Sequence, residues 1–134
     1  MSEAKIQPGL FYNKEHEWVK IEGDTATVGI SDHAQHLLTD IVFVELPKVG
    51  KPVKQFDPAC VVESVKSVSD VYAPLSGTVG EVNSALEGAP ASVNTDPYGA
   101  GWMFKLTGVN AGETANLMNA EQYGEFLAKA GEGH

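Results

Sequence analysis

The chain has 134 residues, 43% of them hydrophobic, which is enough apolar material for one compact domain and too little for two. All nine of its basic side chains are lysines, and the formal net charge is −9, which argues against nucleic acid as a partner. Its longest apolar runs are far shorter than the roughly 20 residues that span a bilayer, so no membrane helix is expected.

Seven segments rich in β-branched residues recur between glycine- and proline-containing turns. Turn signals such as Glu22-Gly23-Asp24 and Leu46-Pro47-Lys48-Val49-Gly50 separate them. In chain order, we predict strands at residues 18–22, 25–30, 41–45, 59–64, 68–72, 77–82 and 102–107.

Helical patterns occur in two places. Ser31 or Asp32 is a candidate N-cap for a short helix at residues 34–38. Apolar residues at helical spacing occupy the tail at 113–130, where Asn119 followed by Gln122 resembles a second cap, so we predict two short helices there. The fold class predicted is mainly β, a flattened barrel or sandwich with short helices, including a C-terminal helical segment.

Two segments, 26–29 and 77–80, share three residues, which fits a domain of two similar halves, although chance explains it equally well. We expect one domain at residues 10–130, a flexible segment at 1–9 and a frayed end at 131–134.

The first five residues have neither the apolar core of a secretory signal nor the arginine-rich character of a transit peptide. We therefore expect a cytoplasmic protein, or a protein of the mitochondrial matrix if a presequence has been removed. A single cysteine, Cys60, excludes an internal disulfide, and its apolar neighbours predict a buried side chain.

The segment with chemical interest is Glu63-Ser64-Val65-Lys66-Ser67, which lies between two predicted strands. It is short enough for a hairpin tip and lacks the Asn-Gly pair of a primed turn, so a type I turn with Lys66 near its apex is expected. An exposed lysine on a rigid base is accessible to an acylating enzyme. From this local pattern alone, a solvated lysine paired with Glu63 or Asp70 is the commoner outcome.

Further motifs add to this segment. Glu63-Ser64-Val65-Lys66 with Ser69-Asp70, together with the motifs at residues 12–19, 26–35, 40–47 and 94–102 in that order, closely resembles the H protein of the glycine cleavage system. The resemblance extends over residues 10–126. Two departures are Phe56 and Thr39, which stand where the family usually has glycine.

The resemblance implies a lipoyl-domain-like fold and a non-enzymatic carrier with lipoate attached covalently to Lys66. Such a carrier takes the aminomethyl group of glycine from a pyridoxal-phosphate glycine decarboxylase to a tetrahydrofolate-dependent aminomethyltransferase. A dihydrolipoyl dehydrogenase containing FAD then reoxidises the dithiol. A carrier that meets three partners in turn, besides the enzymes that attach lipoate, is expected to be a monomer.

The resemblance also assigns roles to further residues. Lipoyl-attaching enzymes are expected to recognise Glu63, Ser64 and Val65 beside Lys66. The loaded arm is expected to rest in a surface cleft, where Glu17 and Asp70 hold its amine and Glu15 occupies a neighbouring polar position.

Other interpretations have less support. His33 and His36 have the spacing of two metal ligands, but no third ligand is evident nearby. A serine-lysine hydrolase dyad at the hairpin needs a buried lysine, whereas an exposed one is expected. Two alternative functions stay open: a related lipoyl carrier for sulfur oxidation or lipoyl relay, and an unmodified β-rich interaction domain.

Overall fold

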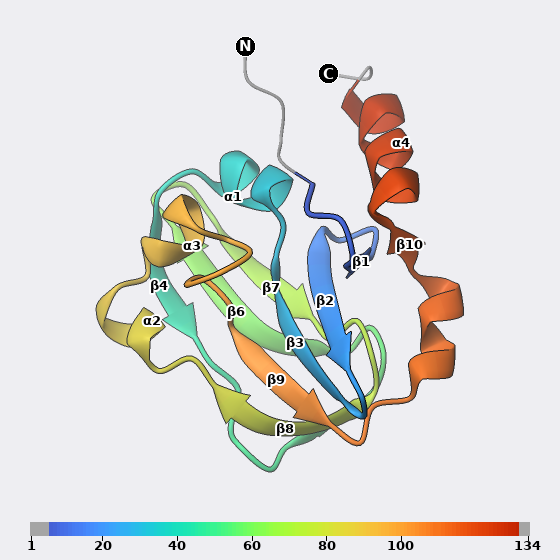
Figure 1. Ribbon diagram of the computed structural model, residues 1–134. Coiled ribbons are helices and arrows are strands. Elements are labelled where there is room, and N and C mark those ends of the chain that lie inside the picture. Colours follow the sequence, from blue (N-terminus) through green and yellow to red (C-terminus); the bar gives the residue numbers. More distant parts are fainter. Residues whose placement is uncertain (1–5, 132–134) are drawn as a thin grey trace.

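The computed structural model describes residues 6–131, which form two antiparallel sheets with helices around them (Figure 1). The larger sheet has seven strands in the order β10-β1-β2-β3-β9-β8-β5, and the smaller has three in the order β4-β6-β7. The strands of the larger sheet are β1 Phe11–Tyr12, β2 Glu17–Glu22, β3 Thr25–Ile30, β5 Pro52–Val53, β8 Gly77–Val82, β9 Phe104–Thr107 and β10 Met118–Asn119. Those of the smaller sheet are β4 Ile41–Glu45, β6 Pro58–Ser64 and β7 Val68–Tyr72.

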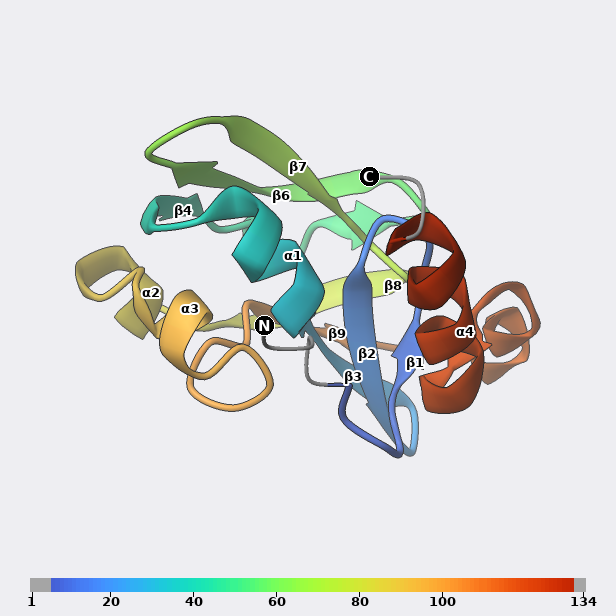
Figure 2. The same cartoon turned by 90° about the horizontal axis from the view of Figure 1, so that it is seen from above.

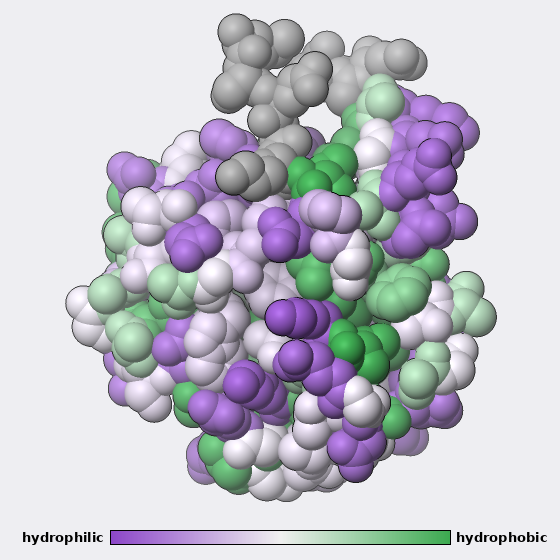
Figure 3. Space-filling view, in the orientation of Figure 1, coloured by the Kyte–Doolittle hydropathy of each residue, from purple (hydrophilic) through white to green (hydrophobic). Residues whose placement is uncertain are grey.

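Within the part of the chain that the structure describes, five helical segments surround the sheets. They are α1 Asp32–Leu38, α2 Ala85–Gly88, α3 Ser92–Thr95, the 3-10 helix η1 Ala111–Asn116 and α4 Ala120–Gly131. Figure 3 shows hydrophilic side chains along the outer side of α4. No helix within residues 6–131 is long and apolar enough to cross a membrane.

The mainly β prediction is confirmed, and each of the seven predicted strands is present. β2 and β6 begin one residue earlier than predicted, and β9 begins two residues later because Trp102 still belongs to the preceding turn, where its N–H donates to Gly99 O at 3.0 Å. The sequence prediction missed β1, β5 and β10, whose two residues are too few to show alternation, and also α2 and α3, which are about one turn long.

The caps of the two longer α-helices agree with the sequence pattern. Ser31, not Asp32, is the N-cap of α1, because its Oγ accepts a hydrogen bond from Ala34 N at 3.2 Å. Asn119 and Gln122 form a reciprocal capping box with two 2.8 Å bonds at the start of α4.

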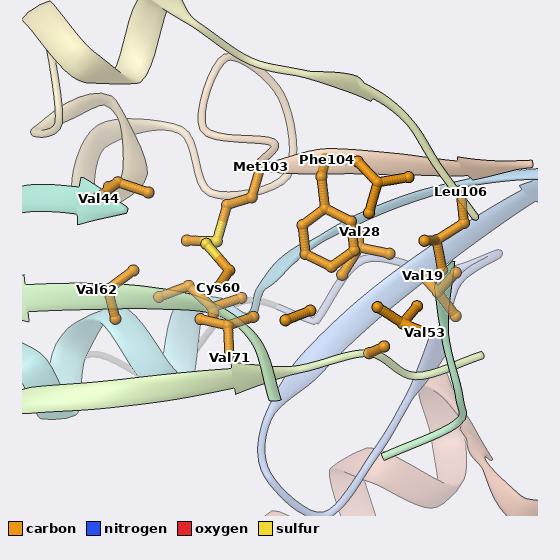
Figure 4. Packing of buried hydrophobic residues seen from close by; sticks show 14 of the residues in the cluster. Val19, Val28, Val44, Val53, Cys60, Val62, Val71, Met103, Phe104 and Leu106 are labelled. Atoms are coloured by element: carbon orange, nitrogen blue, oxygen red, sulfur yellow. The ribbon is translucent and has the colours of Figure 1, made fainter. Parts of the chain in front are cut away.

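A single large apolar core fills the space between the sheets. Figure 4 shows Val28, Phe104 and Leu106 of the larger sheet facing Val71 of the smaller one. Cys60 is buried as predicted, and burial raises the pKa of its thiol to about 12. A second cluster, formed by Leu10, Tyr12, Trp18 and Tyr123, joins α4 to the first strands.

The two segments with similar sequences lie on β3 and β8, which flank β9 on either side, with Thr25 and Thr78 both opposite Thr107. The domain boundaries stay predictions. Residues 1–5 and 132–134 of the predicted terminal segments lie outside the described residues. Of the described N-terminal residues, Ile6 packs against the second cluster.

Thr39 and Phe56 both have left-handed backbones, with φ of +63° and +72°. The resemblance described above identified the same two positions as departures from the pattern that it implies. Glycine accepts positive φ without a steric penalty, whereas a side chain with a Cβ does not. The ψ of Thr39, −146°, places this residue in a region that is mostly restricted to glycine.

Replacing Thr39 with glycine is therefore expected to stabilise the protein by about 1 kcal/mol, since relief of strain exceeds the entropy that glycine adds to the unfolded chain. The backbone bonds of Thr39 to Gln35 and Asn94 are retained in this variant. Urea denaturation measures the change. Thr95→Gly, at the exposed last residue of α3, is the control and should lose stability. Equal losses in both variants would contradict the assignment of strain to Thr39.

Candidate functional site

The β6–β7 hairpin carries Lys66 at its tip. Ser64 N donates to Ser67 O at 2.8 Å, and Ser64 Oγ accepts from Lys66 N at 3.2 Å and from Ser67 N at 3.1 Å. Neither Val65 nor Lys66 has a positive φ, so the turn is not of a primed type, as expected. The serine hydroxyl thus holds the backbone of the turn while the lysine side chain projects outward.

Lys66 is exposed, and the ion pairs found among residues 6–131 do not include it. The expected alternative, pairing with Glu63 or Asp70, is therefore not formed in this structure. The tip is further tied to the fold by Val65 N, which donates to Asp40 O at 3.0 Å just before β4. In Figure 2 the hairpin projects beside β4 and α1, on the side away from α4.

A surface cleft of about 320 Å³ begins at the base of this hairpin. Ser67, Ser69 and Asp70 line it from the hairpin, and Glu15, His16 and Glu17 line it from the start of β2. Its remaining walls are apolar and come from the end of β3, from α1 and from the inner sides of β6 and β7: Ile30, Ala34, Leu37, Leu38, Val62 and Val71.

Glu17 is the most unusual residue of this cleft. Its side chain is only 1% exposed, and Oε1 has no hydrogen-bond partner. Burial raises the pKa of the carboxyl to about 8, although the neighbouring Asn13 side chain and the Tyr72 N–H oppose that rise. An enclosed carboxyl with a free acceptor is chemically suited to a cationic hydrogen-bond donor.

The turn before Glu17 depends on Asn13, which is buried. Its Oδ1 accepts from Glu15 N at 3.0 Å and from Glu17 N at 2.9 Å. The sequence prediction missed Asn13, although an asparagine four residues before a strand is a recognisable turn signal. A second hollow of about 450 Å³ lies beside this turn, and both Asn13 and Glu15 line that hollow.

The structure places the residues predicted from the sequence in two groups. Glu63, Ser64 and Val65 form the hairpin arm that leads to Lys66, with Val65 66% exposed. Glu15, Glu17 and Asp70 line the same cleft, Glu15 and Asp70 as exposed residues at its mouth and Glu17 as its buried member. The apolar walls were not predicted, because residues so far apart in sequence share no local pattern.

The other candidate sites lack a complete set of ligands. His36 lies 3.4 Å from Asp32 on the same helix. Within residues 6–131, no group of three or more His, Cys, Asp or Glu side chains is arranged to hold a metal ion.

Comparison with known proteins agrees with the geometry. The family model described as "Glycine cleavage H-protein" matches residues 10–130. The glycine cleavage system H protein of Xanthobacter autotrophicus is 58% identical over 116 residues, which cover 87% of this chain and 93% of that protein. The one from Rubrobacter xylanophilus is 52% identical, with 92% and 96% covered.

A solved structure supports the same assignment. The crystal structure of a glycine cleavage system H protein from Mycobacterium marinum superposes with a TM-score of 0.80 at 39% identity, covering 94% of this chain and 99% of that one. These relatives decide between the functions left open by the sequence. The chain belongs to the glycine cleavage H-protein family, and it is a non-catalytic lipoyl carrier of the glycine cleavage system.

Proposed function

We propose that Lys66 is the residue to which lipoate is attached, and that the cleft beside it is the resting place of the loaded arm. The hairpin tip supports the attachment: its backbone is held by Ser64 while the Lys66 side chain is exposed. Glu63, Ser64 and Val65 are the residues by which an attaching enzyme would recognise this lysine. The exposed apolar side chains of Val65 and Val68, on either side of it, offer contact area to such an enzyme.

The lining of the cleft suits the chemistry of the arm. When attached, the lipoyl group would supply a disulfide that is reduced as it accepts the aminomethyl group of glycine, and the arm would be left as a dithiol once that group has been passed on. The apolar walls from α1 and β6 suit the hydrocarbon part of the arm. The unpartnered Oε1 of Glu17 suits the amine of the carried group, and this buried acceptor is the observation on which the assignment rests.

The three carboxylates have different tasks in this proposal. Burial keeps Glu17 largely protonated near neutral pH, and an ammonium beside it would favour the ionised form. Asp70 and Glu15, at the mouth of the cleft, add negative charge around the amine. By enclosing the amine, these residues limit the access of water to the carried group.

The partners proposed are the glycine decarboxylase with pyridoxal phosphate, the tetrahydrofolate-dependent aminomethyltransferase and the FAD-containing dihydrolipoyl dehydrogenase. The support for them is membership of the glycine cleavage system. We propose a monomer that works in the cytoplasm, or in the mitochondrial matrix if a presequence was removed. The free buried thiol of Cys60 is consistent with such reducing compartments.

Lys66→Arg is expected to abolish lipoylation, because arginine keeps the positive charge but lacks the primary amine that forms the amide. Intact-mass measurement after incubation with a lipoyl-attaching enzyme checks this: the added mass of one lipoyl group should be absent. Lys54→Arg, in the loop before β6, is the control and should gain the full mass. Lipoylation of the Lys66→Arg protein would contradict the proposed site.

Glu17→Ala is expected to leave lipoylation intact but to speed loss of the aminomethyl group by about tenfold or more, the effect of removing a charged hydrogen bond. Release of formaldehyde from the isolated loaded protein measures this rate. Glu22→Ala, at an exposed glutamate of the same strand, should decay like the parent. If both variants retain the group equally well, Glu17 is not part of the resting site.

The raised pKa of Glu17 also predicts how stability depends on pH. Between its ordinary pKa of 4.5 and about 8, the folded protein binds a proton that the unfolded chain lacks, so this group destabilises the fold as pH rises. The free energy of unfolding of the parent, relative to Glu17→Gln, should fall over this range by about 5 kcal/mol at most. Urea denaturation at several pH values tests this, and parallel curves for the two proteins would contradict it.

A further inference from the structure

Tyr123 of the C-terminal helix α4 contacts residues that belong to both walls of the cleft. Its hydroxyl lies 2.9 Å from His16 Nδ1 and 2.7 Å from Ser31 Oγ. His16 belongs to the β2 wall, and Ser31 is the N-cap of α1, which supplies Ala34, Leu37 and Leu38 to the opposite wall. Tyr123 itself is fully buried and is not among the residues that line the cleft.

The His16 end of this link has a constrained backbone. His16 has a φ of +72°, a conformation that side chains with a Cβ keep only when surrounding contacts hold them there. Its N–H donates to Asn13 O at 3.1 Å, and its carbonyl accepts from Ser31 N at 2.8 Å. Because Glu17 follows directly, the orientation of this turn determines where the Glu17 carboxyl enters the cleft.

The Tyr123 end is rigid. Its ring stacks on Tyr12 with centroids 4.3 Å apart and planes 1° from parallel, and Phe126 packs on it from the same helix. Burial, together with the nearby His33, lowers the pKa of His16 to about 4, so the imidazole is neutral and Nδ1 can accept from the tyrosine or donate to it. The Tyr123 hydroxyl therefore has His16 as a partner on one side and Ser31 on the other, and neither of these partners is charged.

We propose that Tyr123 is a positioning residue for the loaded arm: its hydroxyl bridges His16 and Ser31, and thereby holds the turn that directs Glu17 into the cleft. The inference rests on the proposed role of Glu17. It gives the C-terminal helix, which lies beyond β1 and β2 from the hairpin in Figure 2, a part in retaining the carried group.

The test compares Tyr123→Phe with Tyr12→Phe. Both variants remove one buried hydroxyl from the same stacked pair, but the Tyr12 hydroxyl donates to Gln7 O at 2.7 Å and is not part of the link between His16 and Ser31. Tyr123→Phe should speed loss of the aminomethyl group by about fivefold, roughly the value of one hydrogen bond, while Tyr12→Phe decays like the parent. Equal decay in Tyr123→Phe and Tyr12→Phe would overturn the proposal.

A second readout needs no lipoyl group. In unmodified protein, a carbon-13 NMR titration of the Glu17 carboxyl should give a lower pKa in Tyr123→Phe than in the parent, because a loosened turn admits water. Tyr12→Phe should leave that pKa unchanged. His16→Asn, which accepts a positive φ but loses the ring bond to Tyr123, should shift the pKa in the same direction. An unchanged titration in both Tyr123→Phe and His16→Asn contradicts the inference.

Glu17→Ala separates this inference from the function on which it rests. If Tyr123 acts through Glu17, Tyr123→Phe should add nothing to the decay rate in the Glu17→Ala background. Additive effects would mean that Tyr123 acts by another route, and would overturn the inference alone. If Glu17→Ala decays like the parent, the proposed resting site itself is wrong, whatever the NMR titration gives.

Discussion

The burial of the Glu17 carboxyl at the edge of β7 is the constraint around which the site is built. β7 is the outer strand of the smaller sheet, and such an edge leaves backbone N–H groups without strand partners. The Glu17 carboxyl, from the larger sheet, lies against this edge, where the Tyr72 N–H favours its ionised form. A buried side chain of the larger sheet therefore lies at the seam between the two sheets, in the wall of the cleft.

This arrangement separates a fixed part of the molecule from a free one. The hairpin backbone is held by Ser64 and by the bond from Val65 N to Asp40 O, whereas the Lys66 side chain is exposed. A carrier needs both properties, because its partners must find the tip in one place and the arm must leave the protein surface. The cleft then supplies the third requirement, which is a nearby place where the carried amine is shielded from water.

Three residues other than glycine have a left-handed backbone within residues 6–131, and they differ in what holds them. Thr39 and Phe56 are not among the residues that line the cleft beside Lys66. His16 lies on the cleft, and its conformation is supported by Asn13, Ser31 and Tyr123. Strain at His16 is therefore tied to the placement of Glu17, whereas strain at Thr39 is a local cost.

The sequence by itself determined the β-rich class, most strand positions, the Asn119 cap and the hairpin that carries Lys66, and it narrowed the first helix cap to Ser31 or Asp32. These features are encoded within a few neighbouring residues, through alternation, turn residues and cap chemistry. Local pattern alone left Lys66 as an ordinary surface charge, and only the motifs spread along the chain indicated a lipoyl carrier.

Only the tertiary structure decided that Glu17 is buried with a free oxygen, that α1 and β6 supply the apolar walls, and that Tyr123 reaches His16 across 107 positions of the chain. Burial and hydrogen bonding between distant segments depend on how the two sheets pack. Since that packing is the sum of many weak contacts between distant residues, no short stretch of sequence predicts it.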